Sequence, residues 1–322
     1  MRDRLLTWAA WVAATVAAMI TAFGLADRAG LEGTAGWVFD LASHWPKQLF
    51  LLAFGAALLA GFVKAWRAAG FASAIAALNA TLVLDVGGFA LPAKSPADAV
   101  LIKVVSANIH RSWQALTAIV RMADEYDADV VSLYEAPEDL TDQKLSELFP
   151  DMPVMAMPSR TPMGRRLVKR SLLVARAGGA DQIDATPFEY TNSVIIRFPL
   201  PAGGAQVQII AAHPPSPGMP NQMFDRNQQL VRLADGLVAD KPFVVMGDFN
   251  TTPWGRIFGA VPGTRAGDPR FEGSFPAVMG PLGLPIDHIK FGGGLTLVDY
   301  RIGPDIGSDH RPLFATFALP SR

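Results

Sequence analysis

The sequence predicts an α/β domain that follows an apolar, helical N-terminal region. Mean hydropathy is +0.25 over 322 residues, and residues 5 to 90 carry most of the apolar excess. The remaining part, about 225 residues, is long enough for one substantial core. It contains apolar runs with the length and β-branching of buried strands, and a helical pattern lies between two of them. These observations together favour an α/β fold.

Composition narrows the classes of function. The chain has no cysteine, which excludes disulfides and thiolate metal sites. Its formal net charge is −1, and the part from Asp98 onward holds 21 lysines and arginines against 24 aspartates and glutamates, a charge of −3. Domains that grip long nucleic acids are usually basic. The charge therefore counts against a nucleic-acid-binding domain.

The first apolar segment, Leu5–Leu25, is uncharged and has the length of a transmembrane helix. Trp8 and Trp11 lie toward its start, near the expected membrane interface. A cleaved signal peptide is the alternative interpretation. The run is long for a signal peptide and more apolar segments follow it, so a retained helix is favoured.

Two further segments raise the prediction to about three transmembrane helices within residues 1–90. Gln48–Val63 is short for a span, and Ala68–Ala90 is weakened by Asn79 and Asp85. An interfacial or buried helix therefore remains the alternative for the third segment.

Basic residues predict the orientation of these spans. Arg2 and Arg4 precede the first span, and Lys64 and Arg67 lie between the second and the third, whereas the loop over residues 26–47 is not enriched in basic residues. The positive-inside rule places these basic ends in the cytoplasm. With three spans, everything after about residue 90 lies on the outer face, and residues 91–99 form a linker.

The catalytic domain, residues 100–322, is expected to begin with a strand, a helix and a second strand. Val100–Ile109 is the first strand, with Asn108 near its end. Ser112 is a suitable N-cap for a helix that runs to about Tyr126. Asp129–Glu135 is the next strand. Both strands end in a polar side chain.

The middle of the domain continues with three predicted strands, Lys169–Ala177, Ser193–Phe198 and Gln206–Ala212. A stiff proline-rich loop, Pro214–Pro220, precedes a predicted helix over Asn221–Val238. Thr252–Gly283 is rich in glycine and proline and is expected to be a long loop.

A buried strand over Pro242–Met246 delivers Asp248 and Asn250 at its end. Residues two apart in an extended segment point to one face, so both side chains are expected at one place. Gly247 permits a close approach of backbone or ligand. A carboxylate and an amide at a strand end suit hard cations and phosphate oxygens, although they also cap turns.

Seven strings, in order, resemble motifs of the endonuclease/exonuclease/phosphatase superfamily, whose fold is like that of deoxyribonuclease I. Tyr134 departs from the family's usual glutamine, and Pro214 from its usual leucine. The strings are Ser106-Ala107-Asn108-Ile109, Val131-Ser132-Leu133-Tyr134-Glu135, Ala212-His213-Pro214-Pro215, Arg226 with Gln229, Gly247-Asp248-Phe249-Asn250, Ile286-Asp287-His288-Ile289, and Ser308-Asp309-His310-Arg311-Pro312-Leu313.

The resemblance implies a four-layer α/β sandwich of two mixed sheets flanked by helices, with a Mg²⁺ or Mn²⁺ cofactor. Phosphoester hydrolysis needs a hard cation, an oriented water and a proton source. By resemblance the metal residues are Asn108, Glu135 and Asp309. Among them Glu135 is the best candidate ligand, Asn108 helps to coordinate or orient, and Asp309 is either a second metal ligand or a polarising group. The catalytic residues implied in the same way are His213, Asp248, Asn250, Asp287 and His310. Which histidine is the acid and which the base stays open.

Other polar residues carry weaker predictions. His110 follows Asn108 and is a candidate substrate contact, whereas His288 is expected to pack and His44 to be interfacial. A basic cluster over residues 160–170 is either a solvated loop or a clamp for phosphate or anionic lipid head groups. Its candidate substrate-binding residues are Arg165, Arg166 and Arg170.

The sequence thus predicts a membrane-anchored, metal-dependent phosphoesterase of the cytoplasmic membrane with its active site on the outer face. An enzyme that acts on a freely soluble substrate does not need three transmembrane helices, so a lipid-linked phosphate substrate is favoured. Polyprenyl pyrophosphate, on which some membrane members of the family are thought to act, and phospholipids are the examples. An extracytoplasmic nuclease is the first alternative, and a catalytically inactive membrane scaffold is the second. The sequence predicts neither the particular substrate nor an oligomeric state.

Overall fold

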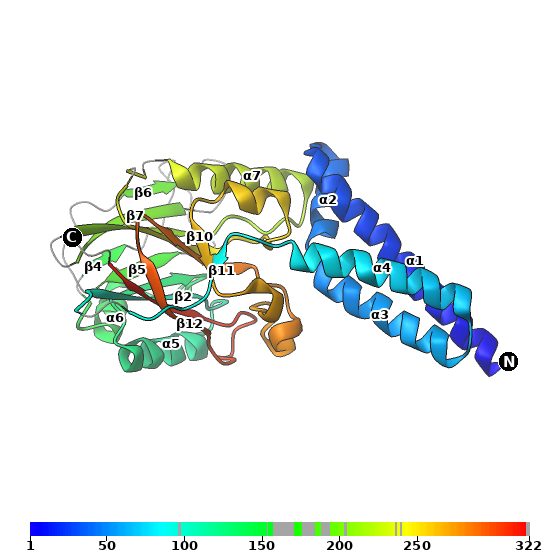
Figure 1. Cartoon of the computed structure of the whole chain (residues 1–322). Helices are drawn as coiled ribbons and strands as arrows, with labels where there is room; N and C mark the ends of the chain where they lie inside the picture. Colours follow the sequence, from blue (N-terminus) through cyan, green and yellow to red (C-terminus); the bar gives the residue numbers. More distant parts are fainter. Residues whose placement is uncertain are drawn as a thin grey trace. The chain divides into compact units, whose positions relative to one another are not determined.

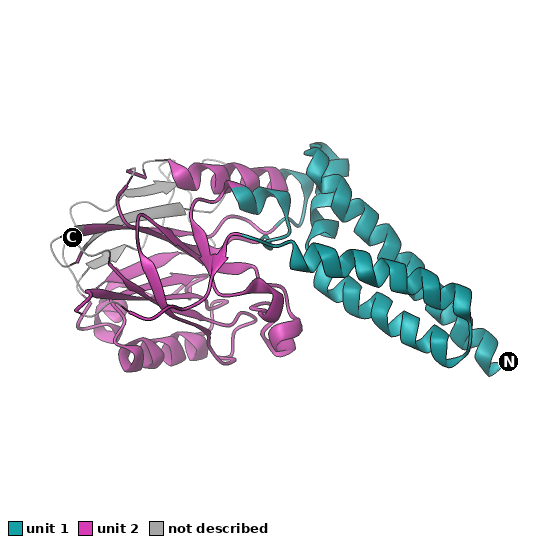
Figure 2. Cartoon of the chain, in the orientation of Figure 1, with its two compact units in different colours: residues 1–87, 217–221, 251–259 teal, residues 88–216, 222–250, 260–322 magenta. Residues whose placement is uncertain are grey.

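The computed structural model describes residues 1–95, 98–152, 154–156, 171–175, 184–187, 194–202, 205–235, 237–238 and 240–319 (Figure 1). The chain forms two compact units (Figure 2). The helical unit consists of Met1–Gly87 together with two short segments, Pro217–Asn221 and Thr251–Gly259. The rest of the chain forms the sandwich unit.

The helical unit contains three long helices and one short one. They are α1 (Arg2–Ala26), α2 (Gly33–Ser43), α3 (Pro46–Phe62) and α4 (Trp66–Leu84), with a 3₁₀ turn after α1 at Asp27–Ala29. Proline occupies the first position of α3, where its fixed φ and missing N–H are tolerated. A left-handed Gly30 ends the 3₁₀ turn.

The long helices meet through small side chains. Their buried residues include Ala10, Ala14 and Ala17 of α1, Ala53, Ala56 and Ala60 of α3, and Ala68, Ala72 and Ala76 of α4. Large side chains point outward instead: Trp8, Phe62 and Trp66 are 68%, 79% and 70% exposed. Small residues inside and large apolar residues outside are typical of helices that pack within lipid.

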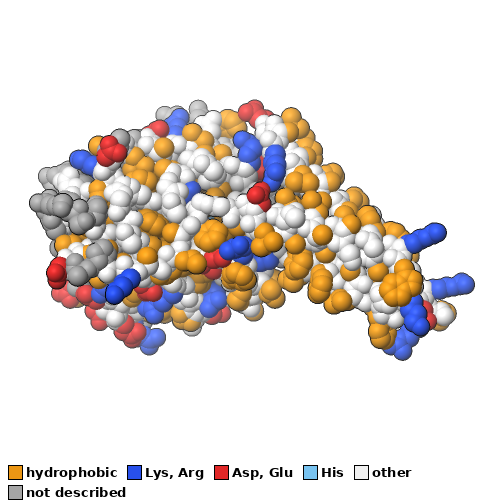
Figure 3. All heavy atoms as spheres, viewed as in Figure 1, with side chains coloured by type: hydrophobic (Ala, Val, Ile, Leu, Met, Phe, Trp, Pro, Cys, Tyr) orange, Lys and Arg blue, Asp and Glu red, His pale blue; other side chains and the backbone are white. Residues whose placement is uncertain are grey.

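Two helices, Arg2–Ala29 and Trp66–Leu84, are long and apolar enough to cross a membrane. A third span results if α2 and α3, bent by 65°, count as one. Figure 3 shows apolar side chains along these helices and lysines and arginines at the end that carries the N-terminus. The basic residues at that end are Arg2, Arg4, Lys64 and Arg67.

The boundaries of the apolar segments differ in part from the sequence-based expectation. The expected loop over residues 26–47 contains α2, whose glycines and Asp40 had obscured its helical character. Asp40 is buried, 3.5 Å from His44, which explains how an acidic residue is accommodated there. The third segment stops at Leu84, and Phe89–Ala90 is a strand, β1, rather than the end of a helix.

Both short segments of the helical unit are tied to its helices by hydrogen bonds. Trp37 donates its indole N–H to the carbonyl of Pro217, 2.7 Å away. His44 Nδ1 lies 3.0 Å from the hydroxyl of Thr252. The backbone N–H of Arg256 donates to the carboxylate of Asp27 at 3.1 Å. The chain therefore returns twice to the helical unit after leaving it.

Two mixed sheets build the sandwich unit. Among the described residues, the first has seven strands in the order β1-β10-β11-β9-β8-β7-β6, and the second has six in the order β12-β13-β2-β3-β5-β4. The first comprises β1 (Phe89–Ala90), β10 (Thr264–Ala266), β11 (Asp287–Gly292), β9 (Phe243–Asp248), β8 (Ala205–Ala212), β7 (Val194–Ala202) and β6 (Asp184–Pro187). The second comprises β12 (Thr296–Ile302), β13 (Leu313–Ala318), β2 (Leu101–Asn108), β3 (Val130–Tyr134), β5 (Leu172–Ala175) and β4 (Val154–Ala156).

Alternating side chains of β2 divide the core into layers. Val104 contributes to the core between the sheets, with Ile209 of β8 and Val244 of β9. Val105 instead joins the core beneath α5 (Trp113–Tyr126), with Ile119. Figure 1 shows α5 and α6 (Asp142–Leu148) outside the second sheet and α7 (Pro220–Val231) outside the first. The predicted four-layer α/β sandwich is confirmed.

The β2–α5–β3 unit follows the sequence-based expectation closely. Strands β2 and β3 are parallel, and the hydroxyl of Ser112 caps α5 by accepting a hydrogen bond from Ala115 N at 3.1 Å. Two later expectations need correction. The helix expected over Asn221–Val238 ends at Val231 and continues only as a 3₁₀ turn, because Asp235 adopts an extended conformation. The loop expected over Thr252–Gly283 contains β10, which pairs with β11.

Candidate active site

Strand ends from both sheets meet at one end of the sandwich. Asn108 ends β2 and Glu135 follows β3 in one sheet, while Asp248 ends β9 and Asp287 begins β11 in the other. His213 follows β8, and His310 precedes β13. These strands neighbour one another in their sheets, so their polar tips converge.

Asn108 links carboxylates from the two sheets. Its Nδ2 donates to Asp248 Oδ2 at 3.1 Å and lies 3.4 Å from Glu135 Oε1. Its Oδ1 accepts from the backbone N–H of His110 at 3.0 Å. Glu135 has a positive φ of 53°, which lets the chain turn sharply after β3 while its side chain stays largely buried. The three polar groups therefore form the floor of the site.

His213 faces the same two carboxylates. Its Nε2 lies 3.3 Å from Asp248 Oδ2 and 3.7 Å from Glu135 Oε1. The ring is 2% exposed and packs against Tyr134, with ring centroids 5.7 Å apart. Within the described part of the chain, neither ring nitrogen makes a hydrogen bond of good geometry. A buried imidazole in this condition suits a bound phosphate oxygen or another ligand.

His310 and Asp287 form a carboxylate–imidazole pair. His310 Nδ1 lies 2.8 Å from Asp287 Oδ2, and its Nε2 lies 3.7 Å from Asp248 Oδ2. Phe275 packs against the imidazole ring, with the two ring centroids 4.8 Å apart. The hydroxyl of Ser308 accepts from His310 N and donates to the carbonyl of Asn108 at 2.7 Å. These contacts fix the ring from several sides.

Burial and charge act in opposite directions on these groups. Burial lowers the pKa of His310, but the carboxylates of Asp287 and Asp248 outweigh it and raise the pKa to about 10. Burial also opposes ionisation of Asp248, yet His310 and His213 hold the pKa of that carboxyl well below its usual range. Burial raises the pKa of Asp287. The pair of Asp248 and His310 is therefore ionised at neutral pH.

Asn250 reaches the site by a turn rather than by an extended strand. Strand β9 ends at Asp248, and Asn250 has a φ of 50°, so the expected alternation of an extended segment does not hold there. Its N–H donates to Asp248 Oδ1 at 3.0 Å, and its Nδ2 donates to the carbonyl of Pro214 at 3.0 Å. Arg226, fully buried, donates to the carbonyl of Asn250 at 2.9 Å.

Gly247 is required by the packing of this strand. A Cβ at that position would lie 1.9 Å from the carbonyl oxygen of Ala212 in the neighbouring β8. The expected close backbone approach is thus confirmed, and the approaching group is backbone.

His110 and Asp309 lie at the rim of the site. His110 Nδ1 is 3.4 Å from Asp309 Oδ1 and 3.8 Å from Glu135 Oε2. The side chain of His110 is 63% exposed and that of Asp309 is 38% exposed. Both are thus placed to meet a group that enters the site from solvent.

The donors fit a hard divalent cation. Four carboxylates, of Glu135, Asp248, Asp287 and Asp309, lie among three imidazoles, and acidic and amide oxygens suit Mg²⁺ or Mn²⁺. Ligand atoms of Asp248, Asp287 and His310 lie within 4.8 Å of one another. His310 is already engaged by Asp287 through its Nδ1. Glu135, with Asn108 and Asp309, is the better candidate set.

Three further sequence-based predictions have the following outcomes. His288 is fully buried, and its Nδ1 accepts from Arg265 at 3.0 Å, so it packs as expected. His44 is buried in the helical unit. The candidate substrate-binding residues Arg165, Arg166 and Arg170 lie outside the described residues.

The sequence analysis missed supporting residues. The hydroxyl of Tyr134 donates to the carbonyl of Met246 at 2.9 Å, and it accepts from Ser132 at 2.6 Å. Tyr134 thereby joins the two sheets beneath the site, which gives a structural role to its departure from the family's glutamine. Ser308 was also missed, although it lies inside a recognised string, as was Ser274, whose hydroxyl accepts from the backbone N–H of Asp287 at 3.2 Å. No pattern in the sequence marks which carbonyl or N–H such hydroxyls meet.

Comparisons with known proteins agree with this geometry. The family model described as "Endonuclease/Exonuclease/phosphatase family" matches residues 105–310. An endonuclease/exonuclease/phosphatase from Beutenbergia cavernae is similar in structure, with a TM-score of 0.53 and 17% identity, covering 69% of this chain and 72% of its own. Another from Bacteroides vulgatus has a TM-score of 0.51 and 15% identity, covering 68% and 99%.

An AP endonuclease from Archaeoglobus fulgidus is also similar, with a TM-score of 0.50 and 14% identity, covering 66% of this chain and 98% of its own. At these identities the solved structures show a shared fold. Among curated proteins, no relative matches the chain in sequence.

Proposed function

This chain belongs to the endonuclease/exonuclease/phosphatase family, and on that premise we propose that it is a membrane-anchored, divalent-metal-dependent phosphoesterase. Members of this family are generally hydrolases, both phosphatases and nucleases. The observation that carries the proposal is the convergence of Glu135, Asn108, Asp248, His213 and the Asp287–His310 pair at one end of the sandwich.

The cation would be held by Glu135, with Asn108 and Asp309 beside it. Once bound, it supplies positive charge that neutralises the phosphate and polarises the phosphorus–oxygen bond. Asn108 keeps Glu135 and Asp248 in place through its hydrogen bonds. His110, at the rim, is placed to contact the substrate.

The protein's own groups account for the proton movements of hydrolysis. Water attacks phosphorus and the bond to the leaving oxygen breaks. His213 and His310 are the groups placed to take the proton that the water loses and to supply the proton that the leaving oxygen gains. Asp248 is ionised and buried, so it can orient the attacking water. Asn250 fixes the other oxygen of Asp248 through its backbone N–H. His213 Nε2 faces the same pocket of carboxylates and is placed to hydrogen-bond the phosphate.

Asp287 acts on His310 rather than on the substrate. It fixes the tautomer and orientation of the imidazole and supports positive charge on it. That charge stabilises the negative charge that develops on the phosphate. We assign no fixed acid or base role between His213 and His310.

We further propose that the substrate is a lipid-linked phosphate or pyrophosphate, such as polyprenyl pyrophosphate or a phospholipid, hydrolysed at the outer face of the membrane. Support comes from the helical unit, which has two or three helices suited to span a bilayer. Four of its basic residues, Arg2, Arg4, Lys64 and Arg67, lie at one end, whereas Arg28, Lys47 and Arg256 toward the other end are interspersed with Asp27, Asp40 and Asp85. This excess of positive charge favours a cytoplasmic location for the first end.

The test is a phosphate-release panel on the full-length protein in detergent, across lipid, sugar and nucleotide phosphates and DNA, with and without Mg²⁺ or Mn²⁺. We expect metal-dependent release from the lipid-linked substrates. The Asp248→Ala variant should lose several orders of magnitude in turnover. The matched Asp299→Ala variant removes an exposed carboxylate of β12 and should keep full activity.

Failure has distinct forms in this panel. Ready cleavage of DNA without release from any lipid phosphate would replace the lipid substrate by a nucleic acid. Full activity of Asp248→Ala would remove the proposed site. An unchanged biological effect of that variant, without any turnover, would indicate a scaffold.

A further inference from the structure

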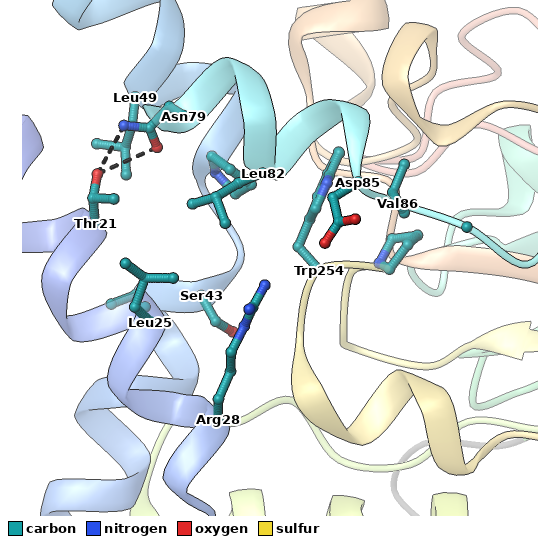
Figure 4. Close-up of a pocket in the computed structure, with 15 residues that line it drawn as sticks. Thr21, Leu25, Arg28, Ser43, Leu49, Asn79, Leu82, Asp85, Val86 and Trp254 are labelled. Atoms are coloured by element: carbon teal, nitrogen blue, oxygen red, sulfur yellow. Dashed lines mark hydrogen bonds between the residues drawn. The ribbon is translucent and has the colours of Figure 1, made fainter. Parts of the chain in front are cut away.

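A cavity of about 160 Å³ lies within the helical unit (Figure 4). It is lined by the C-terminal ends of α1 and α4, by the turn between α2 and α3, and by Pro253 and Trp254. Every lining residue belongs to the helical unit. The candidate active site uses none of them, so this is a separate site.

The lining combines an apolar wall with one side chain of each charge. Leu25, Leu49 and Leu82 supply the apolar wall. Arg28 and Asp85 supply the opposite charges, and both residues are exposed at the rim. Within the described chain neither forms an ion pair, with the other or with any residue. Figure 4 draws Asp85 and Trp254 on one side of the cavity and Arg28 reaching from another.

Trp254 provides an independent sign of a ligand. Its indole Nε1 is buried and has no hydrogen-bond partner within the described residues. An unsatisfied buried donor is unfavourable, so an acceptor that enters the cavity beside it would be bound favourably. The indole face also attracts an organic cation, particularly beside a carboxylate such as that of Asp85.

The position of the cavity along the helices indicates its depth. It lies where α1 and α4 end, whereas Arg2, Arg4, Lys64 and Arg67 lie at the opposite end of the same helices. Helices that cross the hydrocarbon core place their ends among the lipid head groups. The cavity is therefore expected at the head-group level of one leaflet, with its apolar wall continuing toward the acyl chains.

We propose that this cavity binds the head group of a zwitterionic, amine-bearing phospholipid of the phosphatidylethanolamine type. Arg28 and the Trp254 N–H receive phosphate oxygens, and Asp85 with the indole face of Trp254 receives the ammonium group. A purely anionic head group would satisfy Arg28 but would meet Asp85 as a like charge. The proposal goes beyond the proposed function, and it depends on the membrane location but not on hydrolysis.

Native mass spectrometry of the delipidated, full-length protein tests this proposal. The protein is equilibrated in detergent with equal amounts of phosphatidylethanolamine and phosphatidylglycerol that carry identical acyl chains. We expect one phosphatidylethanolamine to be retained, in preference to phosphatidylglycerol by about tenfold, which corresponds to about 1.4 kcal/mol. Asp85→Asn should abolish the preference, and Arg28→Gln should weaken retention of both lipids.

Matched controls separate this site from general charge effects. Glu32→Gln and Arg4→Gln remove one exposed charge of each sign elsewhere in the helical unit and should leave retention unchanged. Leu82→Trp keeps both charges but fills the cavity, and it should reduce retention. Equal retention of the two lipids, or an unchanged preference in Asp85→Asn, overturns the proposal.

The outcome is independent of the phosphate-release panel. A protein that retains phosphatidylethanolamine but hydrolyses no substrate keeps this inference and loses the proposed function. A protein that hydrolyses lipid phosphates but retains both lipids equally keeps the proposed function and loses this inference.

Discussion

Asp287 Oδ2 lies 2.8 Å from Nδ1 of His310, and Nε2 of the same ring lies 3.7 Å from Asp248 Oδ2. If Asp287 acts only through the ring of His310, the two residues should not contribute independently to catalysis. We predict that Asp287→Asn and His310→Gln each lower kcat/KM by about 10²–10⁴. The double variant should lose no more kcat/KM than the less active of the two single variants, because the effects of residues that act as a unit are not additive.

Phosphate release is measured for the native protein, the two single variants and the double variant. Together they form a double-mutant cycle, which gives the coupling between Asp287 and His310. The control is Asp299→Asn, which removes an exposed carboxylate on β12 and should retain activity. Losses that simply multiply in the double variant would show that Asp287 acts on something other than His310.

At the scale of single residues, the polar tips were predictable and their supports were not. Asn108, Glu135 and Asp248 end or follow apolar runs, and a pattern in the sequence can show that. Tyr134 meets the carbonyl of Met246, 112 positions later, and Ser308 meets that of Asn108, 200 positions earlier. Such partners depend on how two sheets pack, which no local pattern encodes.

Strand β9 carries Asp248 and must lie very close to β8. We predict that Gly247→Ala lowers the free energy of unfolding by about 3 kcal/mol or more, because the new Cβ meets the backbone oxygen of Ala212 and overpacking of a rigid core is costly. Thermal unfolding in detergent measures this. Gly259→Ala is the matched control, since a Cβ there meets nothing within 4 Å. Equal stability of the two variants would contradict the close packing of β8 and β9.

Strand β11 buries a lysine whose charge opposes folding. Burial, assisted by the like charge of Arg265, lowers the pKa of Lys290 to about 8 from an ordinary 10.5. Below pH 8 the amine is protonated in both folded and unfolded chains, so the penalty is constant. Between pH 8 and 10.5 the unfolded chain binds more protons, and stability due to this group rises with pH.

We therefore predict that the stability of the native protein rises relative to Lys290→Met as the pH increases from 8 to 10.5. Urea unfolding of both proteins in detergent at pH 7.5, 9 and 10.5 measures the difference and cancels other titrations. A difference that stays constant across this range would show that the amine is not desolvated in the folded protein.

At the scale of elements, local patterns were predicted well and non-local ones poorly. The β2–α5–β3 unit has long apolar runs and a serine cap, so its sequence alone defines it. Strands β1 and β10 have two and three residues and exist because they pair with each other across 176 positions. Helix α2 was missed because its glycines and Asp40 hide its periodicity.

For the whole molecule, the distribution of charge predicts how the chain lies in a membrane. The end of the helical unit with Arg2, Arg4, Lys64 and Arg67 should be cytoplasmic, and the sandwich unit should be outside. The packing of the helices, with alanines buried and tryptophans exposed, is typical of helices that pack within lipid. The family strings in the sequence identify the fold but contain no information about this orientation.

The absence of cysteine from the chain allows a direct measurement of this orientation. We predict that a membrane-impermeant maleimide applied to intact cells labels Leu31→Cys and Asp305→Cys, and that it labels Asp3→Cys and Arg67→Cys only after the cells are broken. All four positions carry exposed residues, so accessibility within the fold is matched and only the membrane distinguishes them. Labelling of Asp305→Cys solely in broken cells would place the candidate active site in the cytoplasm, and an outer-face lipid substrate would then have to be given up.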